Sequence, residues 1–224
     1  MNKQGNTYTF LYSVVLVVVV AALLSIVSLS LQPRQNENRQ NEKRQNILSA
    51  IHISSTAANS AELFDKYIKE QFIINSKGDR IEGKAFDVNI EKQYNLPVEK
   101  RELPVFVANV DGATKYILPI YGAGLWGPIW GYISLDDNKD TVYGTFFDHQ
   151  GETPGLGAEI TTPEFNKEFR NKQIFSGNQL VGKGGNASGA NEVDAISGGT
   201  ITSKGVETMI KNYLTYYEPF LKQK

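Results

Sequence analysis

The sequence predicts an α+β protein, in which an antiparallel sheet with flanking helices follows one N-terminal transmembrane helix. Three observations support this prediction. Residues 8–31 carry no charged side chain and form an apolar stretch long enough to span a bilayer. Short β-type runs separated by turns begin at residue 72. Near the C-terminus, helical spacing is shown by Val206, Met209, Ile210, Tyr213, Leu214 and Tyr217.

The N-terminal region divides by composition. Residues 1–7 are a short tail and residues 8–31 the membrane anchor. Residues 32–46 contain Pro33 and cannot bury a core, so they are a polar stalk or an exposed extension of the helix. A cleaved signal peptide is the alternative for residues 8–31, but the stretch is too long for a typical apolar region and lacks a clean small-x-small site. We therefore expect a retained anchor, followed by one folded domain over residues 47–224.

Within the domain, hydrophobic periodicity assigns most elements. Helices are expected over residues 47–53, 61–71 and 163–171, with Thr162 as the cap of the third. Strands are expected over residues 72–75, 103–110, 115–121, 130–135 and 141–148, with turns between them. Residues 84–96 show no clear pattern and are expected to be an irregular connection.

Composition excludes several functions. The formal net charge is −1, so there is no electrostatic case for nucleic-acid binding. The absence of cysteine excludes disulfides and thiolate chemistry. The two histidines, His52 and His149, lack metal-ligand spacing, and His52 stands between isoleucines as a structural residue would. We assign no catalytic residue and no metal site.

The C-terminal helix is preceded by a run of hydroxyl and glycine residues, Asp194-Ala195-Ile196-Ser197-Gly198-Gly199-Thr200-Ile201-Thr202-Ser203. Thr202 or Ser203 is expected to cap the helix. The unpaired N–H groups and the positive end of the helix dipole would then face residues 197–200, an arrangement that suits a phosphate. From spacing alone, an ordinary turn before a capped helix is the simpler interpretation.

Two further motifs contain glycines that let a backbone approach a planar ligand. The first is the loop over residues 122–131, which carries Trp126 and Trp130. The second is Glu152-Thr153-Pro154-Gly155-Leu156-Gly157, where Thr153 offers a hydroxyl and Leu156 an apolar contact. Each motif alone is also compatible with a plain loop.

Together the three motifs resemble a known family. Asp-x-x-Ser-Gly-x-Thr resembles the sequence in which a flavin transferase esterifies a threonine with the phosphate of FMN, and the chain looks most like the C subunit of the Na+-translocating NADH:quinone reductase, the NqrC family. The resemblance implies covalent FMN on Thr200, with Asp194, Ser197 and Gly198 recognised by the transferase. Thr202 is the rival acceptor, ranked second because it lies nearer the helix cap. The family usually has alanine in place of Gly199.

The resemblance also implies the remaining cofactor contacts. They are Trp126 at the flavin edge, Glu152, Thr153, Gly155 and Leu156 at the ring, and Ser197, Gly198, Gly199 and Thr202 beside the attachment point. Lys183 stands in a glycine-rich segment, where it is either an exposed loop residue or a hydrogen-bond donor near flavin N1 and C2=O. A cation in that position would raise the flavin potential.

The function implied by the resemblance is electron transfer within a membrane complex. Electrons from NADH would pass through an iron–sulfur centre in a pair of membrane subunits to this flavin, then to a second FMN in another membrane subunit and to quinone, while Na+ is exported. The chain would be one subunit of this translocating oxidoreductase, without complete activity alone. The G subunit of the Rnf complex is an alternative, because it shares the threonine and Pro-Gly-Leu-Gly motifs but not Gly124-Leu125-Trp126. A flavin-free anchored binding module is a second.

The flanking charges and the family resemblance predict opposite orientations of the domain in the membrane. One cation, Lys3, precedes the span, whereas Arg34, Arg39, Lys43 and Arg44 follow it, so a simple positive-inside count keeps the domain in the cytoplasm. Long domains, however, translocate largely regardless of flanking charge. The resemblance implies a single-pass protein of the bacterial inner membrane with its main domain on the periplasmic side, and we adopt that expectation.

Overall fold

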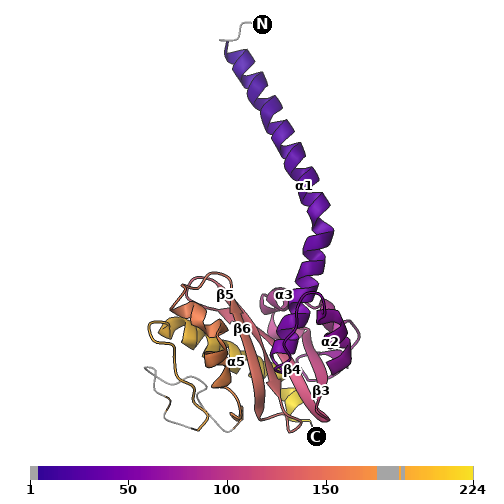
Figure 1. Ribbon diagram of the computed structural model, residues 1–224, viewed down its shortest axis with the longest axis vertical. Coiled ribbons are helices and arrows are strands. Elements are labelled where there is room, and N and C mark those ends of the chain that lie inside the picture. Colours follow the sequence, from indigo (N-terminus) through magenta and orange to yellow (C-terminus); the bar gives the residue numbers. More distant parts are fainter. Residues whose placement is uncertain (1–4, 176–186, 188–189, 224) are drawn as a thin grey trace. The chain divides into compact units, whose positions relative to one another are not determined.

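The computed structural model describes residues 5–175, 187 and 190–223. A six-stranded antiparallel sheet in the order β2-β1-β3-β4-β5-β6 forms the centre of the domain (Figure 1). The strands are β1 (Ile68–Ile74), β2 (Arg80–Ile81), β3 (Leu103–Val110), β4 (Ala113–Ala123), β5 (Pro128–Leu135) and β6 (Val142–His149). The helices are α1 (Asn6–Ser49), α2 (Ser60–Tyr67), α3 (Ile90–Tyr94), α4 (Pro163–Lys167) and α5 (Thr200–Leu221), with 3-10 turns η1 (Ala85–Asp87), η2 (Val98–Lys100) and η3 (Gly157–Thr161). The predicted α+β class is confirmed.

The chain divides into two compact units, residues 1–43 and residues 44–224. The first unit consists of most of α1, which contains Pro33 and an 18-residue window of mean hydropathy 3.0 with no part buried. By length and composition, this helix can cross a membrane. The helix continues through the polar segment to Ser49, so the separate helix expected over residues 47–53 is wrong.

Two other segments differ from expectation, the first because tertiary pairing overrides local pattern and the second because of a local helix cap. The helix expected over residues 61–71 ends at Tyr67, where β1 begins and pairs with β3. The segment over residues 84–96 is not irregular throughout, because Asn89 accepts a hydrogen bond from the Lys92 N–H and caps the short helix α3. Strands β3 to β6 lie within a few residues of their predicted bounds.

Both faces of the sheet are buried. Alternation along the strands divides the apolar side chains, so that Ile117 and Leu118, adjacent on β4, belong to different core clusters. The Leu118 face packs against α5 and α4. The opposite face packs against residues 47–51 and α2. The domain therefore has three layers, with the sheet between two sets of helices.

Helix α5 approaches the sheet closely where its first turns cross β4. A Cβ atom added at Gly205 would lie 2.5 Å from the carbonyl oxygen of Ala123, and one added at Gly122 would lie 2.8 Å from Cβ of Met209. Glycine on both sides thus permits a helix-to-strand distance that larger residues would prevent. This packing holds the N-terminus of α5 beside the loop that follows β4.

Candidate functional site

A pocket of about 420 Å³ lies where the first turn of α5 meets the loops after β4 and β6. Its volume is in the range of small-molecule and cofactor sites. The predicted site residues that line it are Trp126, Glu152, Thr153, Leu156, Gly198, Gly199, Thr200 and Thr202. Three segments that are distant in sequence therefore meet at one cavity.

Some predicted residues are not among those that line the pocket. Asp194, Gly155 and Ser197 lie outside its lining, and Lys183 lies outside the described residues. The N–H of Gly155 is directed to the carboxylate of Glu159, at 3.1 Å, and the residue has φ +74°. Gly155 therefore shapes the turn, as its left-handed conformation requires.

Sequence reasoning missed Leu125, Gly157 and Ile201, which also line the pocket. All three stand inside motifs that the sequence already singled out, so their position was the available signal. Ile201 has an apolar side chain at an exposed helix position, with 59% of its surface accessible. The signal for Ile201 was an apolar residue in the first turn of a helix whose N-terminus suits a phosphate.

Helix α5 begins without a side-chain cap. Its N-cap residue is Gly199, so the predicted capping by Thr202 or Ser203 is wrong. The Ser203 hydroxyl instead donates to the Gly199 carbonyl and accepts from the Ile196 N–H. Among the described residues, none accepts a hydrogen bond from the backbone N–H groups of Thr200, Ile201 and Thr202. The start of α5 therefore presents unpaired donors and the positive end of its dipole.

The two candidate acceptor threonines differ in exposure. Thr200 is exposed at the pocket, whereas Thr202 is 1% exposed. The Thr202 hydroxyl donates to Oε2 of Glu152. Of these two hydroxyls, that of Thr200 is thus the one accessible to a second enzyme without unfolding the first turn of α5.

Glu152 connects the three motifs. Its side chain is 4% exposed, and Oε1 accepts a hydrogen bond from the Trp126 N–H at 2.9 Å, while Oε2 accepts from Thr202. The backbone N–H of Glu152 donates to Nδ1 of His149 at 3.1 Å. Both carboxylate oxygens are therefore used within the protein.

The rim of the pocket is apolar and exposed. Accessible fractions are 69% for Trp126, 48% for Leu125 and 41% for Leu156. Leu156 reaches across to the threonine motif, because a Cβ atom at Gly198 would lie 2.5 Å from its Cδ2. An exposed group of large apolar side chains around a cavity is typical of a surface that a ligand covers.

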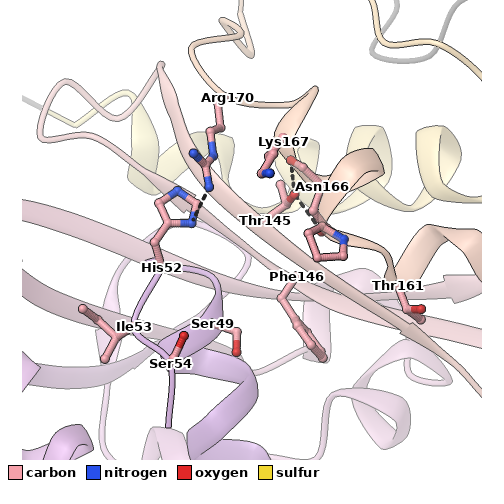
Figure 2. A pocket seen from close by; sticks show the side chains of 11 residues that line it. Ser49, His52, Ile53, Ser54, Thr145, Phe146, Thr161, Asn166, Lys167 and Arg170 are labelled. Atoms are coloured by element: carbon pink, nitrogen blue, oxygen red, sulfur yellow. Dashed lines mark hydrogen bonds between the residues drawn. The ribbon is translucent and has the colours of Figure 1, made fainter.

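A second pocket of about 400 Å³ lies beside α4 and contains none of the predicted site residues (Figure 2). Its cations are Lys167 and Arg170, and Nη2 of Arg170 lies 3.1 Å from Nδ1 of His52. On another side of the pocket, the hydroxyl of Thr145 donates a hydrogen bond to Oδ1 of Asn166, at 3.0 Å. The predicted site residues that the structure describes all lie elsewhere in the domain.

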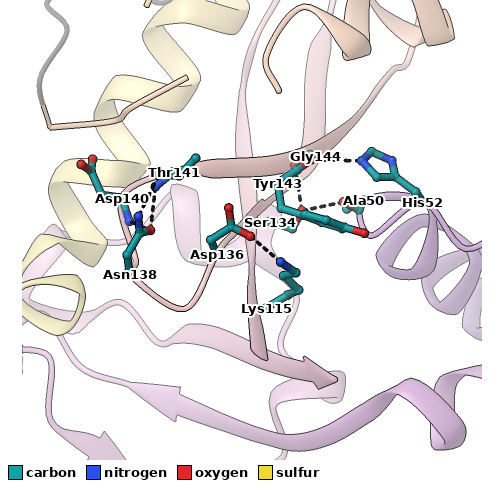
Figure 3. Close-up of polar contacts among 10 residues, drawn as sticks. All are labelled: Ala50, His52, Lys115, Ser134, Asp136, Asn138, Asp140, Thr141, Tyr143 and Gly144. Carbon is teal, nitrogen blue, oxygen red and sulfur yellow. Dashed lines mark hydrogen bonds and ion pairs between the residues drawn. The ribbon is translucent and has the colours of Figure 1, made fainter. Parts of the chain in front are cut away.

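His52 joins the segment after α1 to strand β6 (Figure 3). It has φ +63°, and its Nε2 lies 3.0 Å from the carbonyl of Tyr143. The hydroxyl of Ser134 binds the carbonyl of Ala50 beside it, at 2.6 Å. Desolvation of the His52 ring lowers its pKa below the usual value, and the positive charge of Arg170 adds to that effect. The structural role expected for His52 agrees with these contacts.

Comparison with known proteins decides the family. A profile described as FMN-binding domain matches residues 124–215, a range that contains every residue lining the pocket. The C subunit of the Na+-translocating NADH-quinone reductase of Vibrio vulnificus strain YJ016 is 30% identical over 84% of this chain and 83% of its own length. The chain belongs to the NqrC family, the C subunits of this reductase.

Solved structures of the NqrC family agree with the fold described above. The crystal structure of the C subunit from Parabacteroides distasonis is 45% identical, with a TM-score of 0.79 over 87% of this chain and 98% of that one. NqrC of Shewanella oneidensis, at 24% identity and a TM-score of 0.71 over 83% and 97%, shares the fold. The NqrC family is thus supported along nearly the whole domain.

The residues present fit the FMN that the family profile describes. The unpaired N–H groups at the start of α5 suit a phosphate, and the exposed apolar rim suits a planar ring. Among the described residues, no group of three or more histidine or carboxylate side chains could hold a metal ion.

Proposed function

We propose that this chain is the FMN-carrying, electron-transferring subunit of a Na+-translocating NADH-quinone reductase, with FMN joined through its phosphate to the hydroxyl of Thr200. The observation that carries the proposal is the exposure of Thr200 at an uncapped helix start, beside a pocket in a domain of this family. When bound, FMN supplies a redox group that accepts and passes on electrons. Oxidation of NADH and reduction of quinone would take place in other subunits.

The protein's own residues position and shield the cofactor in this proposal. The first N–H groups of α5, with Ser197 and Gly198, stabilise the negative charge that the phosphoester retains. Leu125, Trp126 and Leu156 cover the ring and exclude water. Two further contacts are proposed, from the hydroxyl of Thr153 to the ring and from Lys183 to its N1 and C2=O side. A linkage through the phosphate leaves the ring electronics to these contacts.

Co-expression with a flavin transferase tests the attachment. We expect a fluorescent band on a denaturing gel for the wild type and for Thr202→Val, no band for Thr200→Ala, and an adduct on Thr200 by peptide mass spectrometry. A fluorescent Thr200→Ala band, or an adduct mapped to Thr202, contradicts the assignment. A colourless wild type would leave the flavin-free binding module as the better description.

The proposal places the chain in the bacterial inner membrane through α1, with the domain on the periplasmic side. The apolar window of α1 supports anchoring, and the family name supports assembly with other subunits. Those partners would be the iron–sulfur membrane subunit pair and the second FMN-bearing subunit. Alkaline phosphatase fused after the domain should be active, because that enzyme works outside the cytoplasm, and an inactive fusion contradicts the orientation. Co-purification with subunits of a ferredoxin-linked complex would favour the Rnf alternative.

A further inference from the structure

We infer that Glu152 is a positioning residue whose buried carboxylate ties the pocket wall at Trp126 to the first turn of α5 at Thr202. The inference deepens the proposed function, because it concerns the geometry of the same pocket. It also replaces the expected direct contact between the Glu152 carboxylate and the flavin ring. Both oxygens of this carboxylate already accept hydrogen bonds from the protein.

The first argument is the connectivity of the two hydrogen bonds. Trp126 is 26 residues before Glu152, and Thr202 is 50 residues after it. In the part of the chain that the structure describes, no strand ladder joins the loop after β4 to the start of α5. One side chain thus bonds to two segments, one carrying the apolar rim and the other carrying Thr200, in addition to the packing of Gly205 against Ala123.

The second argument is the space that glycines leave for this carboxylate. A Cβ atom at Gly124 would lie 2.5 Å from Oε1 of Glu152, and one at Gly157 would lie 2.5 Å from Oε2 and 2.4 Å from the Thr202 hydroxyl oxygen. Any side chain at either position would displace the carboxylate from its partners. Glycines from two motifs are therefore explained by one buried group.

The third argument is electrostatic. Both oxygens act as acceptors, as those of an ionised carboxylate do. Among the described residues, no cation forms an ion pair with Glu152. Reduction adds negative charge to a flavin, and a negative charge at the pocket lining opposes that addition. Glu152 should therefore lower the midpoint potential of the cofactor as well as hold the pocket together.

Hydrogen–deuterium exchange of the full chain without flavin tests the positioning directly. In Glu152→Ala we expect the Trp126 amide to exchange at least about tenfold faster, because it loses a charge-assisted hydrogen bond. The matched control is Glu159→Ala, which removes a carboxylate bound to a backbone N–H in the neighbouring turn but outside the pocket lining. Unchanged exchange at Trp126 in Glu152→Ala, or an equal increase in Glu159→Ala, overturns the inference. This measurement needs no cofactor, so it is independent of the proposed attachment.

A second measurement uses the flavin-loaded chain and milder variants. In Glu152→Gln we expect a higher midpoint potential and an altered visible circular dichroism of the flavin, with both quantities unchanged in Glu159→Gln. Thr202→Val should alter the dichroism, and Thr202→Ser, which keeps the hydroxyl, should restore it. A merely structural Glu152 would lower the melting temperature of Glu152→Gln and leave the potential and the dichroism of the folded protein unchanged. That result overturns the inference even where Glu152→Ala fails to fold.

Discussion

Thr200 and Thr202 lie two residues apart in the first turn of α5, yet Thr200 is exposed whereas Thr202 is buried, with its hydroxyl bound to Glu152. A helix turns by about 100° per residue, so a step of two residues is a rotation of about 200° and the two side chains point to nearly opposite sides. One hydroxyl therefore faces the surroundings and the other faces the interior. This geometry distinguishes two threonines that the sequence motif alone leaves nearly equivalent.

Replacing Thr202 with valine should weaken the domain without removing the flavin. The buried carboxylate of Glu152 would lose a donor, and we expect the free energy of unfolding to fall by about 1–3 kcal/mol. Urea denaturation of the flavin-free chain measures this, and Thr202→Ser should remain near the wild-type value. A Thr202→Val chain of unchanged stability would mean that the hydroxyl contributes nothing to folding.

Trp126→Ala should leave the stability of the domain nearly unchanged but should expose the flavin. Because the side chain is 69% exposed, its loss should change the free energy of unfolding by no more than about 0.5 kcal/mol. The flavin, by contrast, should become more accessible to solvent, which collisional quenching by iodide reports. Identical quenching in wild type and variant would exclude Trp126 as a cover for the ring.

The close packing of His52 and Ala50 against Gly144 predicts that a larger residue at position 144 destabilises the domain. A Cβ atom at Gly144 would lie 2.5 Å from Cε1 of His52 and 2.6 Å from the carbonyl oxygen of Ala50. Gly144→Ala should therefore destabilise the domain by about 1–3 kcal/mol. Gly151→Ala is the control, since nothing lies within 4 Å of an added Cβ there. Equal denaturation midpoints for the two variants would contradict the close packing.

Stability should fall as the medium becomes acidic through the range where His52 titrates. Its pKa in the folded chain is below the usual 6.5, so the unfolded chain takes up the proton first as the pH falls. The stabilisation is complete above about pH 6.5 and is lost as the pH falls toward the lower folded value. His52→Asn keeps a residue that tolerates positive φ but does not titrate there. Urea midpoints at about pH 7.5 and about pH 5.5, on either side of the usual histidine pKa, should differ more in the wild type than in this variant.

Sequence pattern predicted the fold class and most of the strands, because alternation and turn residues act locally, as in β3. It failed where segments distant in sequence determine the secondary structure. Ile68, for example, belongs to a strand because it pairs with β3. The motifs supplied most of the residues that line the pocket. They could not show that the Glu152 carboxylate bonds to Trp126 and Thr202, since those bonds join segments far apart in the chain. The left-handed conformation of His52 accompanies local backbone bonds just past the end of α1, where the Ile53 N–H donates to the Leu48 carbonyl.

The glycine contacts that press α5 against β4 have a mechanical consequence. With Gly205 against the Ala123 carbonyl and Met209 against Gly122, the first turns of the helix lie in close contact with β4, which restricts their movement. A flavin attached to Thr200, as proposed, would explore space mainly through the torsions beyond that residue's Cα atom. The length of the linkage would limit how far the flavin moves. The distance for electron transfer to a neighbouring subunit would therefore vary only within that range.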